Sequence, residues 1–245
     1  MAVAFVSGGS KGIGLATVLR LLAEGHRVIT CSRDADAWKQ AIEQHPQLTS
    51  ADYMRMDISN EAVLKEAFGH IKEKYSQLDI AVNNASPDIA SAGRFAQISD
   101  DDLRSTMTND FWAYALCMKY QLNMMSEGAR IVNISSINGL RPTPSAAMYG
   151  ASKHALEGLT RSVALDAIKN GIRVNSVAPG VTWTSRWERK QQEEPEIREE
   201  VSKLVPVQRF AHPDEVVDAI MYLLSDSAQY IIGHTLVIDG GISLT

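Results

Sequence analysis

The stretch YGASKHA places a tyrosine and a lysine four residues apart, as Tyr149 and Lys153. On an α-helix such residues share one face, so the phenol and the ammonium would be neighbours. The glycine, alanine and serine between them are small and leave that face open to a ligand or a second helix. A free tyrosine has a pKa near 10, and a nearby ammonium favours its phenolate. The pair is either a proton donor with its tuning cation or a partly exposed helix pair without a chemical role.

A serine thirteen residues before Tyr149 favours the chemical interpretation. Ser136 follows a predicted strand, at the end where ligands bind in an open parallel sheet. Its hydroxyl could hydrogen-bond a substrate oxygen on which negative charge develops. Serine, tyrosine and lysine together predict a proton-transfer site.

A glycine-rich stretch, SGGSKGIG at residues 7–14, follows the first predicted strand and opens the first predicted helix. Gly8 permits a tight turn, Gly12 lets backbone N–H groups approach a pyrophosphate, and Gly14 lets the helix pack on the strand. The spacing G-x3-G-x-G differs from the common dinucleotide fingerprint G-x-G-x-x-G. The stretch predicts a dinucleotide site, the alternative being a glycine-rich turn that binds nothing.

The end of the second predicted strand bears on the choice of cofactor. A carboxylate there would accept the 2′-OH of NAD, whereas a cation would meet the 2′-phosphate of NADP. Ser32 and Arg33 occupy this place, and Lys11 adds a second cation from the glycine loop. Asp34, one residue further on, is the counter-argument. The sequence favours NADP(H) over NAD(H).

The elements that must position these residues alternate between strands and helices. Apolar runs rich in β-branched residues predict strands at 3–7, 27–31, 52–56, 79–83, 130–135, 173–177 and 234–239. Helical periodicity covers residues 14–25, 61–75, 113–125, 155–171 and 213–224. The alternation predicts one α/β domain over residues 1–245, with a doubly wound, Rossmann-type parallel sheet of about seven strands and helices on both faces.

Composition limits the partners and the compartment. The net charge of −5 and the pI near 5.7 provide no basic field for nucleic acid or anionic lipid. Two cysteines cannot build a disulfide framework, and the six scattered histidines show no metal-ligand spacing. With no readable signal peptide or membrane span, we expect a cytoplasmic protein without a metal.

Five motifs in register resemble the single-domain form of the short-chain dehydrogenase/reductase family. They are SGGSKGIG (7–14), NNAS (83–86), NISS (133–136), YGASK (149–153) and VNSVAPGVTWT (174–184). The resemblance runs to IDGG (238–241), essentially the whole chain.

This resemblance implies four catalytic residues: Asn109, Ser136, Tyr149 and Lys153. Tyr149 would be the general acid and base, Lys153 would also hold the nicotinamide ribose, and Asn109 would anchor a water that links Lys153 to solvent. The implied cofactor contacts are Ser7, Gly8, Ser10, Lys11, Gly12, Ile13, Gly14, Ser32, Arg33, Asp57, Ile58, Asn83, Ala85, Tyr149, Lys153, Pro179, Gly180, Thr182 and Thr184.

The chain departs from the family pattern at two positions. Ser7 stands where a threonine is usual, which preserves the hydroxyl. Ser86 replaces the glycine of the usual NNAG, so the backbone beside the nicotinamide is expected to turn differently. The segment 86–95 that follows is a plausible part of the substrate mouth.

Substrate choice is expected in residues 137–148 and in a mobile lid at about 183–205, whose tryptophans Trp183 and Trp187 could close an apolar pocket. Much of the lid reads as a solvated helical face interrupted by Pro195. Relatives are usually homotetramers, so we expect a homo-oligomer, a tetramer or a dimer.

The predicted function is hydride transfer between NADP(H) and a small alcohol or carbonyl substrate, with ketone reduction as the working direction. The alternatives are an NAD-dependent alcohol dehydrogenase and, from another class, a nucleotide-binding regulator that has lost turnover. An enoyl reductase is disfavoured, because that relative places its lysine further from its tyrosine than Tyr149 and Lys153 stand.

Overall fold

The computed structural model describes residues 1–245 and contains a single sheet of seven parallel strands. In space the strands follow the order β3-β2-β1-β4-β5-β6-β7. They are β1 (Val3–Ser7), β2 (Arg27–Ser32), β3 (Asp52–Arg55), β4 (Ile80–Asn83), β5 (Arg130–Ile134), β6 (Arg173–Pro179) and β7 (Thr235–Ile238). The predicted Rossmann-type α/β fold is confirmed.

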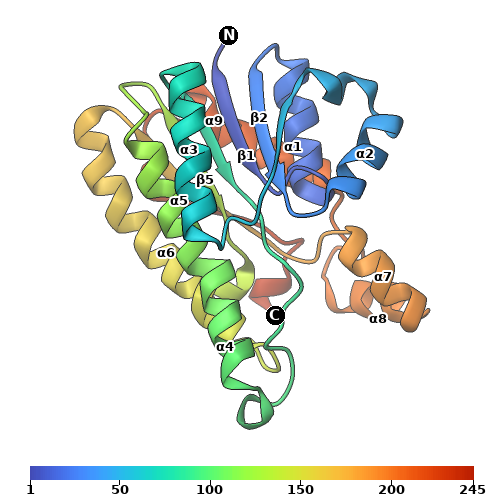
Figure 1. Cartoon of the computed structure of the whole chain (residues 1–245). Helices are drawn as coiled ribbons and strands as arrows, with labels where there is room; N and C mark the ends of the chain where they lie inside the picture. The colour runs from blue at the N-terminus through green and yellow to red at the C-terminus, as the bar shows by residue number, and fades with distance from the viewer.

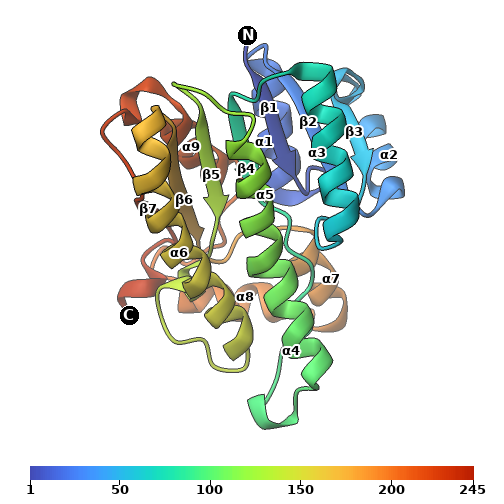
Figure 2. The same cartoon turned by 60° about the vertical axis from the view of Figure 1, so that its left-hand side comes forward.

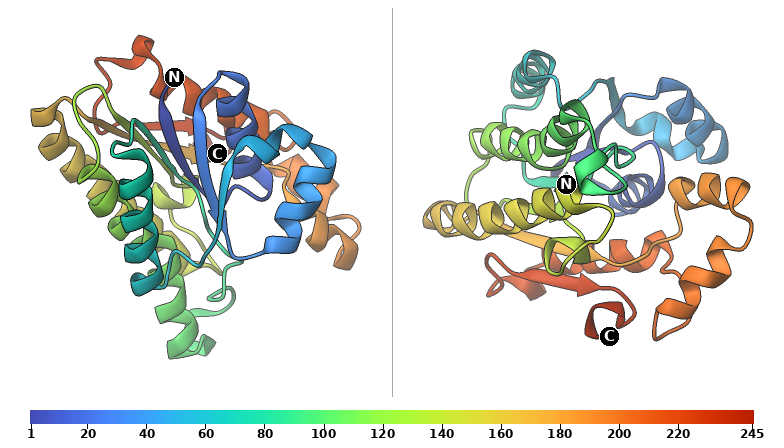
Figure 3. Two further views of the ribbon diagram at one scale, coloured as in Figure 1. Left: turned by 45° about the horizontal axis from the view of Figure 1, so that its top comes forward. Right: turned by 90° about the horizontal axis from the view of Figure 1, so that it is seen from below.

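Nine α-helices accompany the sheet and cover both of its faces (Figures 1 and 2). They are α1 (Gly12–Ala23), α2 (Ala35–Gln44), α3 (Glu61–Tyr75), α4 (Asp100–Met107), α5 (Ala113–Leu122), α6 (Ala147–Ala167), α7 (Ser185–Glu193), α8 (Ile197–Leu204) and α9 (Pro213–Leu224). Helices α3, α5 and α6 lie on one face, and α1, α2 and α9 lie on the other; Figure 3 shows the layers from two further directions.

Each face of the sheet has its own hydrophobic core, because parallel strands with crossover helices bury both of their sides. One core packs α3, α5 and α6 through residues such as Phe68, Tyr114 and Leu156. The other packs α1 and α9 through residues such as Leu21 and Ile220. The strands between them are therefore nearly continuous apolar runs, the pattern that made them recognisable in the sequence.

The strand order reverses between β1 and β4, and this reversal locates the ligand site. β1 pairs with β2 on one side and with β4 on the other, at Ala4 opposite Ile80. Crossovers then leave in opposite directions and open a crevice at the carboxyl ends of these strands. Helix α4 and the helices α7 and α8 lie at that end of the sheet (Figure 1).

Helices α2, α4, α7 and α8 fall outside the predicted periodic segments, although α7 and α8 lie in the lid that reads as a solvated helical face. Helix α2 carries only Trp38 and Ala41 into the core, and α4 is a short, acidic helix with one buried residue, Thr106. Neither has a wide enough apolar stripe for a recognisable 3.6-residue period. The predicted interruption near Pro195 is confirmed, since α7 ends at Glu193 and α8 begins at Ile197. No helix combines the length and hydropathy that a membrane span needs.

Candidate active site

The glycine loop turns β1 into α1 and presents free backbone donors to the crevice. Gly8 has φ +75°, a conformation that side chains rarely adopt, and a Cβ on Gly14 would lie 2.1 Å from the Gly8 carbonyl oxygen. Helix α1 has no side-chain cap and no acidic residue in its first turn. Its first N–H groups and the positive end of its dipole are therefore available to an anion.

The segment after β4 braces this loop from behind. The Ser7 hydroxyl accepts hydrogen bonds from the backbone N–H groups of Asn84 (2.9 Å) and Ala85 (3.1 Å). The Asn84 amide in turn donates to the carbonyls of Ser7 (3.1 Å) and Gly8 (3.3 Å). These bonds fix the glycine loop to β4, so the two sides of the crevice are joined directly.

Asn83 lies in the core rather than in the crevice. Its amide exchanges two hydrogen bonds with Gln121 of α5, at 2.7 and 3.1 Å, and donates to Asn133 of β5 at 2.9 Å. Side chains alternate between the two faces along a strand, so Asn83 and Asn84 cannot both point to the ligand. Here Asn84 lines the cavity and Asn83 braces the sheet.

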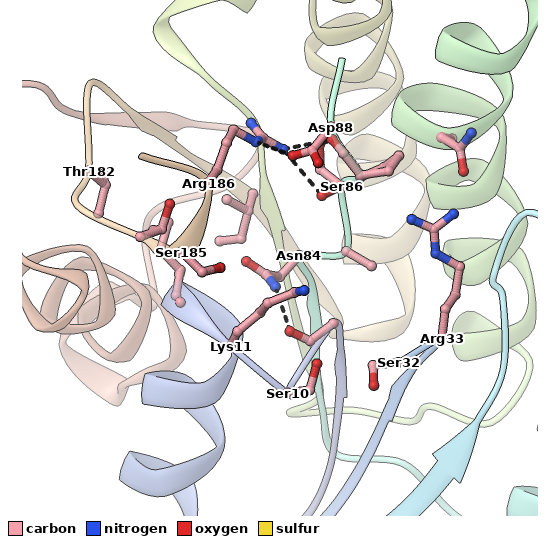
Figure 4. Close-up of a pocket in the computed structure, with 18 of the residues that line it drawn as sticks. Ser10, Lys11, Ser32, Arg33, Asn84, Ser86, Asp88, Thr182, Ser185 and Arg186 are labelled. Carbon is pink, nitrogen blue, oxygen red and sulfur yellow. Dashed lines mark hydrogen bonds and ion pairs between the residues drawn. The ribbon is translucent and has the colours of Figure 1, made fainter. Parts of the chain in front are cut away.

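Two cations border the cavity near the end of β2: Arg33 directly after the strand and Lys11 from the glycine loop (Figure 4). Lys11 lies 3.7 Å from Asp34, and Arg33 lies 3.5 Å from Asp57. Asp34 also caps α2, and the hydrogen bond from the Ala37 N–H is the main reason that its pKa is lowered, with the Lys11 ammonium contributing.

Asp57 is likewise engaged in its own turn. One of its oxygens accepts from the backbone N–H of Ser59 at 2.9 Å and from the Ser59 hydroxyl at 2.7 Å. Each acid at this end of the cavity therefore accepts a backbone N–H group besides its ion pair, and the side chains of both pairs are partly exposed, from 38% to 56%.

At the other end of the cavity, on the β5 side of the strand reversal, Ser136, Tyr149 and Lys153 line the wall. Ser136 follows β5, and its hydroxyl accepts a hydrogen bond from the Asn138 N–H at 3.1 Å, which leaves its own hydrogen free for donation. Tyr149 and Lys153 come from the first turns of α6. The Lys153 Nζ lies 5.6 Å from the centre of the Tyr149 ring.

The ammonium of Lys153 is buried in a defined set of contacts. Its Nζ donates to the Ile134 carbonyl at 3.3 Å, lies 3.5 Å from an Asp110 carboxylate oxygen, and stands 4.5 Å from the centre of the Tyr114 ring. Burial disfavours the ammonium, but Tyr114, Tyr149 and Asp110 outweigh that effect, and the pKa of Lys153 is raised. Lys153 is thus a permanent cation beside Tyr149.

Asn109 lines the same cavity from the π-helical turn Thr108–Trp112, between α4 and α5. Its amide donates to the Ser105 carbonyl at 2.8 Å and is 3.2 Å from the Ser105 hydroxyl. Its side chain is therefore bound within its own helical segment. The four predicted catalytic residues all border one cavity.

Nearly all of the predicted cofactor contacts line this cavity as well. The exceptions are Ser7, Gly14 and Asn83, which support it from behind. Further polar residues line the cavity, among them Asn84, Asp88, Arg186 and Arg189. The last three lie in the segments 86–95 and 183–205 that the sequence assigned to the substrate mouth and the lid, but none of the four was singled out. Their sequence signal was weak, because they lie on irregular loops or on an exposed helix face.

The segment after β6 closes one side of the cavity through ion pairs. Arg186 of α7 donates to the carbonyls of Ser86 (3.3 Å) and Pro87 (2.6 Å), and both Arg186 and Arg189 pair with Asp88 (Figure 4). These contacts tie α7 to the loop after β4 across the mouth of the cavity.

The two tryptophans of this segment pack against the same ring, that of Phe210. Trp183 and Trp187 both meet the Phe210 ring edge-on, with ring centres 5.0 Å apart in each case. Of the two, Trp187 borders the cavity, while Trp183 is covered by the Arg198 guanidinium at 4.2 Å. Their pairing with Phe210 anchors the start of α7.

A parallel sheet whose uncapped first helix faces a cavity bordered by serine, tyrosine and lysine defines a dinucleotide-dependent oxidoreductase. Residues 8–243 match the family described as enoyl-(acyl carrier protein) reductase. The chain belongs to the short-chain dehydrogenase/reductase family and is an enzyme acting on CH–OH and C=O groups with a nicotinamide cofactor.

Relatives match the chain over almost its full length. A 3beta-hydroxysteroid dehydrogenase from Mediterraneibacter gnavus is 31% identical, covering 98% of this chain and 94% of that protein. A 2,5-dichloro-2,5-cyclohexadiene-1,4-diol dehydrogenase from Sphingobium indicum is 35% identical, covering 97% and 95%. A crystal structure of an actinorhodin polyketide ketoreductase variant with NADPH has a TM-score of 0.91 at 27% identity, covering 100% and 98%.

Proposed function

We propose that the protein reduces a small ketone with NADPH, with Tyr149 as the general acid. The observation that carries this proposal is the arrangement of one cavity: Tyr149, Lys153 and Ser136 border one end, and the cations Lys11 and Arg33 border the other. The first group suits proton transfer to an oxygen, and the second suits a phosphorylated ribose.

The residues present fit NADP(H). The open N-terminus of α1 and the glycine loop would hold the pyrophosphate, and Arg33 with Lys11 would hold the 2′-phosphate. When bound, NADP(H) supplies or accepts the hydride. The rest of the chemistry belongs to this chain's own side chains.

In reduction, Ser136 and Tyr149 would both donate hydrogen bonds to the substrate oxygen. Ser136 is suited to this because a backbone N–H already occupies its acceptor site. Tyr149 would then transfer its proton to that oxygen, and the Lys153 ammonium would stabilise the phenolate that remains. In oxidation the same groups would act in reverse.

The choice of NADP(H) over NAD(H) rests on charge. Asp34 and Asp57, the acids that could accept a ribose hydroxyl, already accept backbone N–H groups, whereas Lys11 and Arg33 are held only by partly exposed ion pairs and would be free to turn to a phosphate. The ketoreductase structure with NADPH and a second relative of known structure, ElxO with NADP bound (29% identical, TM-score 0.91), support this choice.

Two further expectations are part of the proposal. Residues 1–245 would act as one catalytic domain in which 183–205 opens and closes over the substrate, with Trp187 at its edge. The protein would work in the cytoplasm as a homo-oligomer; the exposed apolar side chains of Leu165, near the end of α6, and of Ile168, directly after it, support an interface there. Light scattering on the purified protein would measure its mass.

The test combines cofactor binding with turnover. We expect fluorescence titration to show tighter binding of NADPH than of NADH, and Arg33→Ala to weaken NADPH by at least about tenfold while leaving NADH nearly unchanged. Arg20→Ala is the matched control, since it removes the same charge outside the cavity. Equal losses for both cofactors would contradict the 2′-phosphate argument.

Turnover of ketones and of an enoyl thioester, each with NADPH, separates the two reductions. The family description names enoyl reduction, but the four-residue spacing of Tyr149 and Lys153 supports carbonyl reduction instead. Consumption of the enoyl thioester alone would overturn the proposed reaction.

A further inference from the structure

A buried carboxylate stands beside the proposed catalytic lysine. Asp110 belongs to the π-helical turn Thr108–Trp112, and its side chain, like that of Lys153, is only 1% exposed. Its Oδ1 lies 3.5 Å from the Lys153 Nζ and accepts a hydrogen bond of 2.6 Å from the Ser86 hydroxyl. One carboxylate oxygen thus meets both the ammonium and a hydroxyl.

Asp110 is the only anion among the groups that face this ammonium at neutral pH. Strand β5 contributes the neutral carbonyl of Ile134, and α6 contributes Tyr149. Helix α5 contributes Tyr114, whose pKa is raised chiefly by burial, so that it remains a phenol. The charge of Lys153 is therefore balanced from one side, by Asp110.

Other charged groups approach Asp110 from a cavity on its far side. Arg33 and Asp88 line this neighbouring cavity together with Asn109 and Asp110. Both Arg33 and Asp88 have exposed side chains with partners of their own, Asp57 in one case and two arginines in the other. Solvent screens such charges, whereas the buried pair is little screened.

We propose that Asp110 is the counter-ion of Lys153, fixing the ammonium in place and limiting how strongly it draws Tyr149 toward the phenolate. Asp110 acts through Lys153 and is therefore a positioning residue. The proposal rests on the proposed function, because it takes Tyr149 as the group that gains and loses the proton.

The consequence follows from the signs of the charges. An ammonium near a phenol favours the phenolate, and a carboxylate on the far side of that ammonium opposes it. In a buried site both effects are strong, because the effective dielectric constant is low. Asp110 would therefore favour the phenol form of Tyr149, which is the form that ketone reduction requires.

Ser86 connects this counter-ion to the mouth of the cavity. Its hydroxyl donates to Asp110, while its carbonyl accepts a hydrogen bond from Arg186 of α7 at 3.3 Å. Ser86 stands where the family usually has glycine, which has no hydroxyl. The departure noted in the sequence thus has a specific partner, the carboxylate of Asp110.

The experiment measures ionisation of Tyr149 without a substrate. Phenolate absorbance in the near ultraviolet is recorded against pH for the intact chain and for Asp110→Asn. The same curve with Tyr149→Phe added is subtracted in each background, which isolates Tyr149 from the other tyrosines. We expect the titration midpoint in Asp110→Asn to fall by about one pH unit, because an anion near the phenol is lost.

Two further variants keep the test decisive. Asp101→Asn removes the same charge from an exposed position of α4 and should leave the midpoint where it was. Asp110→Glu keeps the charge and should shift the midpoint by less than Asp110→Asn, even if packing changes. Circular dichroism confirms that each variant is folded.

The outcomes separate this inference from the proposed function. A Tyr149 signal whose midpoint stays fixed or rises in Asp110→Asn would overturn the counter-ion role and leave Tyr149 as the acid. A Tyr149 signal that titrates no earlier than an ordinary tyrosine in the intact chain would overturn both.

Discussion

The two ends of the cavity hold cations in opposite environments. The side chains of Lys153 and Asp110 are each 1% exposed, whereas those of Lys11 and Asp34, at the other end, are 49% and 51% exposed. Coulomb interactions are weak and screened by salt in water but strong in the interior. Under the proposed function, charge at the Lys153 end would bias a protonation state, and charge at the Lys11 end would meet a ligand that reaches it from solvent.

The largest effect on turnover is expected from a substitution of Tyr149, the phenol beside the buried pair of Lys153 and Asp110. Tyr149→Phe removes the proton donor without changing the volume of the side chain, and general acid catalysis contributes about 10²- to 10⁴-fold. We expect ketone reduction to fall by at least about 10³-fold. Steady-state kinetics with NADPH would measure the loss.

Cofactor binding is the control for this variant. NADPH affinity should change by less than about twofold, because no charged group is removed. Tyr120→Phe, a substitution on α5 away from the cavity, should leave turnover unchanged. Undiminished turnover in Tyr149→Phe would remove Tyr149 from the mechanism.

Removing the lysine of each ion pair, Lys153 or Lys11, compares how much the buried and the exposed pair contribute to the free energy of unfolding. Lys153→Met leaves the Asp110 carboxylate buried without its cation, and broken buried pairs cost about 3–5 kcal/mol in unfolding free energy. Lys11→Met breaks a pair that is half exposed, for which we expect less than about 1 kcal/mol. Urea unfolding curves of the two variants give both values.

A double variant checks that the loss comes from the pair. Adding Asp110→Asn to Lys153→Met should recover part of the unfolding free energy, because the isolated buried charge is then absent. If the two single substitutions were strictly additive, the buried ion pair would not be the cause.

Salt should weaken cofactor binding at the Lys11 and Arg33 end of the cavity and leave the ionisation of Tyr149 at the other end unchanged. Raising the ionic strength about tenfold should weaken NADPH binding several-fold, since its phosphate contacts lie at exposed cations. The same change should leave the Tyr149 titration midpoint nearly fixed, because the Lys153 and Asp110 pair is buried. Fluorescence and absorbance titrations at two salt concentrations would measure both responses.

The smallest effect is expected at the mouth of the cavity, where the charges are again exposed. Asp88→Asn removes the carboxylate that Arg186 and Arg189 share, worth about 1 kcal/mol or less per exposed pair. We expect faster proteolysis within residues 183–205 and a modestly higher KM for the ketone. Glu193→Gln, which removes a carboxylate without an ion pair from α7, the helix of Arg186 and Arg189, is the control for proteolysis.

The sequence predicted the fold well because its strands are buried on both faces. Continuous apolar runs between glycine-rich loops and helical periods leave few alternatives to a parallel sheet. Helix α2 escaped prediction because it buries only two residues, and the periodicity gave no signal for α4 because it buries one. The serine, tyrosine and lysine of the site could be placed because each follows a strand or begins a helix.

What the sequence could not provide was the direction of side chains on irregular backbone. NNAS contains two adjacent asparagines, and only the strand register decides that Asn84 faces the cavity while Asn83 faces the core. Asp110 follows Asn109 in a π-helical turn, whose phase differs from that of an ordinary helix. Its burial beside Lys153 depends on the packing of three separate elements.

The reversal of strand order between β1 and β4 also bears on how the chain folds. Strands β1, β2 and β3 are complete by Arg55, but β1 receives its second neighbour only when β4 begins at Ile80. Pairing between distant segments is slow to form. The cavity lies where β1 and β4 pair, between the glycine loop after β1 and Asn84 after β4. A dinucleotide bound there would hold the two halves of the nascent sheet together, so the cofactor should favour completion of folding as well as catalysis.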